Sequence, residues 1–295
     1  MSKLTLRAML GDYPNTMALK DGRVKSDLVE LEFAKADVPH DLFKRVIAGE
    51  FDVAELAIMT YLQARGWNKP IAALPVAIGG RFQHAQLAYN TDFGTVTTKN
   101  IEGKRVGVRT YSQTTPAWVR GILQNDYGVD LSKIHWVTFE DGHVPEYKDP
   151  ANSERAPHGE TFMKMLLAGK IDAAVVMAPD LKLPNIKSVI TDASKEIAAW
   201  YKTYNAIQLN HVMVVKESLL KTNPDAAREI FRMMKEAKAA ANEPLGADGI
   251  DYRPIGYSNN KRNFEMAALY ASQQKIIPRE LKIDDLFNDV TRAMQ

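Results

Sequence analysis

One loop of the sequence carries the residue types that bind a small organic anion. Arg109, Tyr111, Ser112 and Thr114 lie between a short apolar run and a helical stretch. Unpaired backbone N–H groups at a helix start, the positive end of the helix dipole and a guanidinium all attract negative charge. The loop therefore predicts a binding site for a carboxylate. The alternative is that the hydroxyls only cap the helix, with Thr114 or Thr115 at the cap, while Arg109 is solvated.

A second set of side chains could transfer protons. Ligands of open α/β sheets lie beyond the carboxyl ends of the strands, where Tyr13 and Glu55 are expected. Arg81, His84 and His211 lie near two positions where the chain is expected to pass between lobes. Imidazole titrates near neutral pH, whereas a carboxyl must first be raised by an apolar setting, so His84 is the preferred proton donor and Glu55 the second choice. The alternative for each histidine is a purely structural side chain.

Searches for other chemical motifs are negative. The sequence has no phosphate loop, no G-x-G-x-x-G after a strand, no G-x-S-x-G and no H-E-x-x-H. No cofactor is therefore predicted. A divalent metal held by His84, Glu55 and His211 is left open, because these ligand types suit several metals.

Composition narrows the class of partner. The chain has 295 residues, 38 basic and 36 acidic, a formal charge of +2 and no cysteine. Disulfides and thiolate sites are excluded, and neither nucleic acid nor a membrane is expected as a partner. The partner is expected to be a small molecule, and a homo-oligomer is left open. The first ten residues predict a strand and lack the apolar core of a signal peptide, so a cytoplasmic protein is expected.

The periodicity of apolar residues predicts alternating strands and helices. The expected strands cover residues 5–10, 29–33, 51–58, 85–89, 105–108 and 206–215. The expected helices cover 39–48, the stretch after residue 114, 224–241, 259–274 and 283–294.

An internal repeat indicates two similar lobes. Val46-Ile-Ala-Gly-Glu-Phe-Asp-Val-Ala recurs as Leu166-Leu-Ala-Gly-Lys-Ile-Asp-Ala-Ala, and both copies end a predicted helix and begin a strand. Each lobe is expected to contain a βαβ unit with a right-handed crossover, although chance similarity of two helix–Gly–strand joints is the alternative. The predicted class is α/β, a two-lobed periplasmic-binding-protein-like type II fold with its ligand cleft between lobes. Residues 1–88 and 209–295 would form one lobe and 89–208 the other.

Several short motifs, in the same order along the chain, resemble the 4,5-dihydroxyphthalate decarboxylase family. They run from about residue 4 to Phe287 and include Gly11-Asp-Tyr, Asp21-Gly-Arg-Val, Glu50-Phe-Asp-Val-Ala-Glu-Leu, Arg81-Phe-Gln-His, Gly103-Lys-Arg-Val-Gly-Val, Ala117-Trp-Val-Arg-Gly-Ile-Leu, Asn210-His-Val, Pro254-Ile-Gly and Pro278-Arg-Glu-Leu. The resemblance implies a cytoplasmic enzyme that converts 4,5-dihydroxyphthalate to protocatechuate, with a fold similar to ABC-transporter solute-binding proteins. The positions that match are Tyr13, Glu55, Arg81, His84, Tyr111 and His211.

Three departures from the family pattern concern the substrate more than the fold. Asn259-Asn260-Lys261 stands where the family tends to have Pro-Asn-Arg, and Arg109 stands where it often has Pro. The region between Asp141 and Glu160 is compressed.

The leading hypothesis is therefore a cofactor-independent decarboxylase of a hydroxylated aromatic carboxylate. Arg81 and Arg109 would bind carboxylates, His84 or Glu55 would donate the ring proton, and His211 and Tyr111 would polarise the hydroxyls. The alternative from another class is a non-catalytic solute-binding protein for an aromatic or sulfonated anion.

Overall fold

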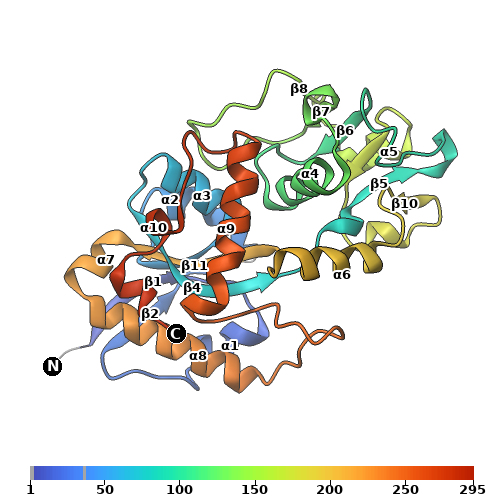
Figure 1. Ribbon diagram of the computed structural model, residues 1–295. Coiled ribbons are helices and arrows are strands. Elements are labelled where there is room, and N and C mark those ends of the chain that lie inside the picture. The colour runs from blue at the N-terminus through green and yellow to red at the C-terminus, as the bar shows by residue number, and fades with distance from the viewer. Residues whose placement is uncertain (1–2, 36–37) are drawn as a thin grey trace. The chain divides into compact units, whose positions relative to one another are not determined.

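The computed structural model describes residues 3–35 and 38–295, and its chain divides into two compact units, each built around one sheet (Figure 1). Unit 1 comprises Met1–Arg81, Leu209–Ser272 and Ile277–Gln295. Unit 2 comprises Phe82–Gln208 together with the short segment Gln273–Ile276. Among the described residues, none of the helices combines the length and the apolar character that spanning a bilayer requires.

The sheet of unit 1 has five strands in the order β2-β1-β3-β11-β4. Strand β1 is parallel to β2 and β3, and β11 is antiparallel to β3 and β4. The bounds are β1 Leu4–Met9, β2 Val29–Phe33, β3 Val53–Ala57, β4 Ile71–Gly80 and β11 Leu209–Lys216. Strand β4 reads as a continuous apolar run with an internal proline, and we did not predict it from the sequence. Its position at the sheet edge explains how the proline is tolerated.

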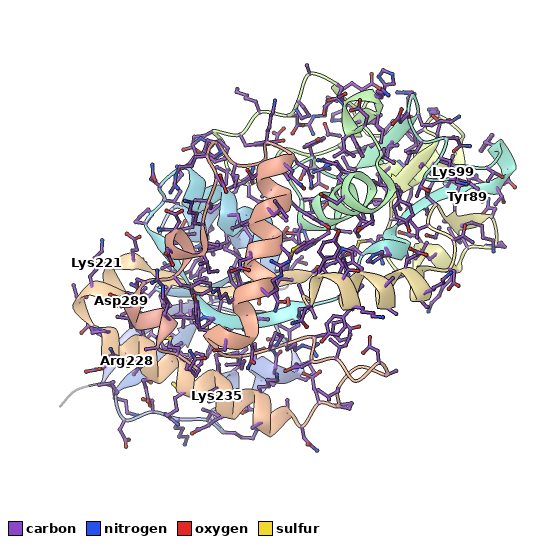
Figure 2. All side chains as sticks on the ribbon, viewed as in Figure 1. Tyr89, Lys99, Lys221, Arg228, Lys235 and Asp289 are labelled. Atoms are coloured by element: carbon purple, nitrogen blue, oxygen red, sulfur yellow. The ribbon has the colours of Figure 1, made fainter. Side chains whose placement is uncertain are left out.

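In unit 1 the predicted and observed helices agree best where the apolar periodicity extends over many residues. Helix α8 (Pro224–Ala241) buries Ile230, Met233, Met234 and Ala237, as the spacing predicts, and packs against α1. Arg228 and Lys235 project from its other face (Figure 2). The remaining helices are α1 Pro14–Lys20, α2 Phe43–Ile47, α3 Ile58–Gly66, α7 Glu217–Thr222, α9 Tyr257–Gln273, α10 Ile283–Leu286 and α11 Asp289–Arg292.

Two predicted helices are broken in the structure. The stretch 39–48 forms a 3₁₀ turn, Pro39–Leu42, before α2. The stretch 283–294 forms two short helices, because Phe287 adopts an extended backbone and Asn288 caps the second helix through its side chain. The second break has a local cause, since the side-chain cap of Asn288 favours a new helix start over continuation of a short apolar periodicity.

The sheet of unit 2 has six strands in the order β10-β5-β9-β6-β7-β8. Strands β9, β6, β7 and β8 are mutually parallel, and β5 is antiparallel to β9 and β10. The bounds are β5 Leu87–Asn90, β6 Arg105–Val108, β7 His135–Thr138, β8 Ser153–Arg155, β9 Ala173–Val175 and β10 Ile186–Ser188. The helices α4 (Thr114–Tyr127), α5 (Phe162–Leu167) and α6 (Ala193–Tyr204) accompany this sheet, which has two apolar clusters of its own.

The internal repeat occupies equivalent places in the two sheets. Its first copy joins α2 to β3, which lies between the parallel β1 and the antiparallel β11. Its second copy joins α5 to β9, which lies between the parallel β6 and the antiparallel β5. The shared glycines, Gly49 and Gly169, both have positive φ after their helices.

The aspartate of each copy ties its strand to a neighbouring one. Asp52 accepts a hydrogen bond from the backbone N–H of Arg7 at 2.9 Å and donates its own N–H to the carbonyl of that residue at 2.8 Å. Asp172 makes the same reciprocal pair with Arg105, at 2.8 and 2.9 Å. Identical roles in two sheets argue against a chance similarity of the two segments.

Gly107→Ala is expected to lower the free energy of unfolding by about 1–3 kcal/mol, the usual cost of overpacking a core. A Cβ at Gly107 would lie 2.7 Å from Cδ1 of Ile171 and 3.3 Å from Cβ of Phe162. Gly79→Ala is the matched control, because no atom lies within 4 Å of its added Cβ. Urea unfolding of both variants measures the difference, and equal stabilities would contradict the predicted clash.

Candidate active site

A buried carboxylate lies in the middle of the sheet of unit 1. Glu55 belongs to β3, all of whose residues are buried, and its side chain is 0% exposed. Its Oε2 accepts from the backbone N–H of Gly11 at 2.9 Å, and its Oε1 accepts from the hydroxyl of Tyr13 at 3.0 Å. The Nδ1 atom of His211 lies 2.8 Å from the same Oε1. These contacts offset the cost of removing a carboxylate from water.

Tyr13 is held in place by the start of α1. Pro14 opens the helix, and the hydroxyl of Thr16 accepts from the backbone N–H of Tyr13 at 3.0 Å. Gly11 is required beside it, because a Cβ there would lie 2.7 Å from the Tyr13 ring. Burial, followed by the charge of Glu55, holds the pKa of Tyr13 well above its usual range. The phenol therefore stays protonated and donates to the carboxylate.

His211 reaches Glu55 through the register of two antiparallel strands. Met213 pairs with Glu55 across β11 and β3, and His211 lies two residues before Met213 on the same face. The His211 ring packs edge-on against Phe43 at 5.4 Å between centroids, and its side chain is 26% exposed. If Glu55 is ionised it can only accept, so Nδ1 of His211 donates. The Nε2 atom is then the ring nitrogen that remains for a substrate.

Tyr13, Glu55 and His211 therefore form one hydrogen-bonded group, called here the unit 1 triad. Tyr13 also lines an open hollow of about 730 Å³, together with Lys20, Phe33 and other residues of the same unit. Such a group can hold a proton, orient an imidazole and polarise a hydroxyl. Its three members are all sequence-predicted site residues, and the structure joins them by hydrogen bonds.

The other predicted site residues do not belong to the unit 1 triad. Arg81 belongs to unit 1, and burial lowers its pKa. His84, Arg109, Tyr111, Ser112 and Thr114 belong to unit 2. Within the described residues there is no group of three or more His, Cys, Asp or Glu side chains that could hold a metal ion.

His84 lies in an aromatic environment rather than beside charged groups. It opens the short 3₁₀ turn His84–Gln86, is 2% exposed and contacts the rings of Phe82 and Trp200 at 6.2 Å between centroids. Burial lowers its pKa to about 4, so the ring is neutral at pH 7. The preference for His84 as proton donor assumed a protonated ring, which this environment disfavours.

The structure contains the predicted loop between β6 and α4 in unit 2, but the cap position of α4 differs from the prediction. Helix α4 begins at Thr114, and its cap position is Gln113, whose side chain makes no capping hydrogen bond. Thr114 and Thr115, the expected cap residues, are therefore the first two residues of the helix. Ser112, Thr114 and Tyr111 are buried, with exposures of 4–5%. A Cβ on Gly142 would lie 2.9 Å from Oγ of Ser112, so the Gly142 segment covers this hydroxyl.

Arg109 already has a carboxylate partner within unit 2. Its Nε lies 3.2 Å from Oε2 of Glu140, and the two side chains are 23% and 57% exposed. Its carbonyl accepts from the backbone N–H groups of Phe139 and Glu140. A ligand carboxylate would have to compete with Glu140 for this guanidinium.

Sequence reasoning missed Arg120, a fully buried arginine of α4 beside Tyr111. The sequence does contain a sign that Arg120 is unusual, because it is the one charged residue in the apolar run Ala117-Trp-Val-Arg-Gly-Ile-Leu. A charge on an apolar helix face is rare unless something compensates it.

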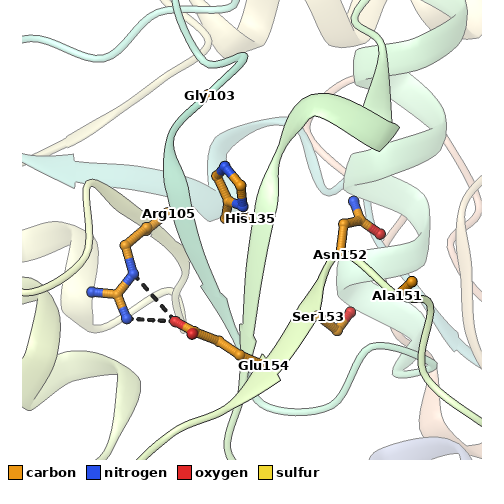
Figure 3. Close-up of a pocket in the computed structure, with 7 residues that line it drawn as sticks. All are labelled: Gly103, Arg105, His135, Ala151, Asn152, Ser153 and Glu154. Carbon is orange, nitrogen blue, oxygen red and sulfur yellow. Dashed lines mark hydrogen bonds and ion pairs between the residues drawn. The ribbon is translucent and has the colours of Figure 1, made fainter.

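A separate hollow of about 490 Å³ lies at the amino ends of β6, β7 and β8 (Figure 3). It is lined by Arg105, His135 and Glu154, among others, and Arg105 is paired with Glu154 by two hydrogen bonds. None of the predicted site residues belongs to it. Its position at the amino ends is opposite to the usual location of ligands in such sheets.

Comparison with known proteins places the chain in a family. No family model matches the sequence. A 4,5-dihydroxyphthalate decarboxylase of Comamonas testosteroni is 29% identical over 259 residues, which cover 82% of this chain and 77% of that protein. A 4,5-dihydroxyphthalate decarboxylase of Pseudomonas putida is 30% identical over 214 residues, which cover 68% of this chain and 83% of that protein.

Solved structures show the fold independently. The periplasmic aliphatic sulphonate-binding protein SsuA of Escherichia coli superposes with a TM-score of 0.63 at 11% identity, covering 97% of this chain and 98% of that chain. The desulfurization enzyme DSZB superposes with a TM-score of 0.58 at 12% identity, covering 98% of each chain. The predicted fold class, that of periplasmic solute-binding proteins, is confirmed. With the two decarboxylases as relatives over most of its length, the chain belongs to the 4,5-dihydroxyphthalate decarboxylase family of carboxy-lyases.

Proposed function

We propose that this enzyme converts 4,5-dihydroxyphthalate to protocatechuate and carbon dioxide, with the unit 1 triad supplying the proton. The observation that carries the proposal is the hydrogen-bonded group of Tyr13, Glu55 and His211, in a chain whose relatives are decarboxylases of that name. The hollow that Tyr13 lines supports it, because a small aromatic acid needs space beside a member of the triad.

The reaction requires one bond to break and one to form. A proton first bonds to the ring carbon that bears the departing carboxylate, and the hydroxyl para to that carboxylate supports this step by pushing electron density onto that carbon. The bond between the ring carbon and the carboxylate then breaks, its electron pair restores the aromatic ring, and carbon dioxide leaves. Positioned acids of this kind contribute about 10²–10⁴-fold in rate.

The triad has the parts for the proton transfer. Since Nδ1 of His211 is bonded to Glu55, His211 would deliver the proton through Nε2. Glu55 would hold the ring through Nδ1 and balance its positive charge, and Tyr13 would keep Glu55 in position. This assignment replaces His84 as donor, because the buried His84 ring is neutral at pH 7.

The direct test is to incubate the purified chain with 4,5-dihydroxyphthalate and follow protocatechuate and carbon dioxide. Phthalate is the matched control substrate, because it has both carboxylates and no hydroxyl to support the step. We expect turnover of the first acid only, with and without a chelator. Binding of the dihydroxylated acid without release of carbon dioxide would overturn the proposal in favour of a solute-binding protein. Turnover abolished by the chelator alone would point to a metal.

A further inference from the structure

The loop that precedes α1 supplies two of the hydrogen bonds to Glu55. The backbone N–H of Gly11 donates to Oε2 at 2.9 Å, and the hydroxyl of Tyr13 donates to Oε1 at 3.0 Å. The two donors are only two residues apart, so the orientation of this short loop decides whether both bonds form at the same time. Whatever fixes the loop therefore acts on the unit 1 triad.

Gly11 cannot fix the loop by its own backbone preference. Glycine has the widest choice of backbone angles of any residue. A larger residue is excluded here, because an added Cβ would lie 2.7 Å from the Tyr13 ring and 2.8 Å from Cγ of Pro39. The orientation of the loop must therefore come from bonds made by other side chains.

The hydroxyl of Thr16, a fully buried residue in the first turn of α1, makes such bonds. Its Oγ1 accepts from the N–H of Tyr13 at 3.0 Å, and it lies 2.7 Å from the carbonyl oxygen of Gly11 and 3.0 Å from that of Tyr13. The Tyr13 carbonyl already accepts from the N–H groups of Thr16 and Met17, at 2.9 and 3.0 Å. Since a hydroxyl has only one hydrogen to donate, we assign it to Gly11, the nearer acceptor.

Side chains of α1 thereby hold three successive peptide groups of the loop. Thr16 binds the peptide group after Gly11 through its carbonyl and the peptide group before Tyr13 through its N–H. Lys20, one turn further along α1, donates from Nζ to the carbonyl of Leu10 at 3.1 Å. That carbonyl belongs to the same peptide group as the N–H that Gly11 donates to Glu55. The loop is therefore oriented from one helix.

Thr291 occupies the equivalent position in α11 and shows what an ordinary cap requires. It is also fully buried, and its Oγ1 accepts from the N–H of Asn288 at 3.0 Å and lies 3.1 Å from the carbonyl oxygen of Asn288. These contacts stay within the cap of its own helix. Thr16 in addition reaches back five residues to Gly11. Capping of α1 alone does not require that longer contact.

We propose that Thr16 is a positioning residue of the decarboxylation, whose hydroxyl holds the N–H of Gly11 and the phenol of Tyr13 on Glu55 at the same time. Glu55 in turn orients His211. The proposal rests on the proposed function for the reaction. Exchange of the Gly11 N–H with solvent can be followed without turnover, so the two proposals fail separately.

The first measurement is kcat and KM for 4,5-dihydroxyphthalate in Thr16→Val, which keeps the branched shape and removes the hydroxyl. We expect kcat to fall at least about tenfold, the value of one hydrogen bond to a charged group. KM is expected to stay within about threefold of the parent, because an interaction that acts on the chemical step lowers kcat without changing substrate binding. Thr16→Ser restores the hydroxyl and is expected to restore the rate.

Thr291→Val is the matched control, because it removes the same kind of buried capping hydroxyl from another helix of unit 1. We expect it to lose as much stability to urea as Thr16→Val and to keep the kcat of the parent. An equal loss of kcat in both variants would assign the effect to stability and overturn the proposal. A parent-like kcat in Thr16→Val, or an equal loss in Thr16→Ser, would also overturn it.

The second measurement is hydrogen exchange of the Gly11 N–H, followed by NMR with the buried amides of β11 as the internal reference. We expect exchange at least about fivefold faster in Thr16→Val, the effect of one lost hydrogen bond on local opening. Thr16→Ser and Thr291→Val are expected to match the parent. Unchanged exchange in Thr16→Val would overturn the proposal.

If Thr16→Val does not fold, Thr16→Ala takes its place with the same expected results. Alanine removes the hydroxyl without placing a methyl group against the carbonyl of Gly11. A parent that releases no carbon dioxide would remove the proposed function. Exchange of the Gly11 N–H would then decide by itself whether Thr16 holds the loop on Glu55.

Discussion

Glu55→Gln is expected to lower the rate of decarboxylation by about 10²–10⁴-fold, the usual contribution of a positioned proton-transfer group. Glutamine has nearly the same shape and can still accept from the N–H of Gly11, but it cannot hold or balance a proton. The His211 ring would lose the carboxylate that lies 2.8 Å from its Nδ1. The rate constants kcat and kcat/KM for 4,5-dihydroxyphthalate measure the effect.

The controls separate catalysis from folding. Glu30→Gln removes an exposed carboxylate from the neighbouring strand β2 of the same sheet and is expected to leave the rate unchanged. Tyr13→Phe removes one of the hydrogen bonds to Glu55 and is expected to cost only about tenfold, the value of one such bond to a charged group. Full turnover in Glu55→Gln, with turnover lost in His84→Asn, would return the donor role to His84.

Protonation of His84 is expected to remove about 3 kcal/mol of folding stability as the pH falls from 6.5 to 4, at 1.36 kcal/mol for each unit of pKa difference. Burial lowers its folded-state pKa from 6.5 to about 4, so the unfolded chain binds the proton first. The contribution of a neutral His84 is therefore complete above pH 6.5. It declines as the pH falls and levels off below about pH 4.

The measurement is the free energy of unfolding in urea at several pH values, for the parent and His84→Gln. We expect the difference between their pH profiles to carry this decline, because the carboxylates that also lose stability in acid are common to both. His135→Gln, which changes an exposed histidine of β7, is expected to follow the parent. Parallel profiles for parent and His84→Gln would show that His84 is not buried as a neutral ring.

The repeated α/β unit could be predicted from the sequence because its determinants are local. A glycine with positive φ ends each helix, and the aspartates Asp52 and Asp172 each bind the backbone of the adjacent strand. These requirements act within a few residues, so they leave a readable pattern. The same holds for α8, whose apolar spacing matches its buried face.

The candidate site could be predicted only as a set of residues. Glu55 was recognisable as a carboxylate in an apolar strand, and His211 as a polar residue in another. Their contact joins positions 156 residues apart and depends on the register of β3 and β11. A shift of one residue would turn one of the two side chains to the other face of the sheet.

The charges of individual groups were decided by tertiary structure alone. The sequence by itself determined the long amphipathic helix α8, the repeat and the family, because these depend on local spacing and on residue identity. It did not determine that His84 is neutral, that Arg109 is balanced by Glu140, or that Arg120 is buried with no ion pair to a carboxylate of the described residues. Solvation and ion pairing depend on which distant segments cover a side chain, and that is known only once the chain has folded.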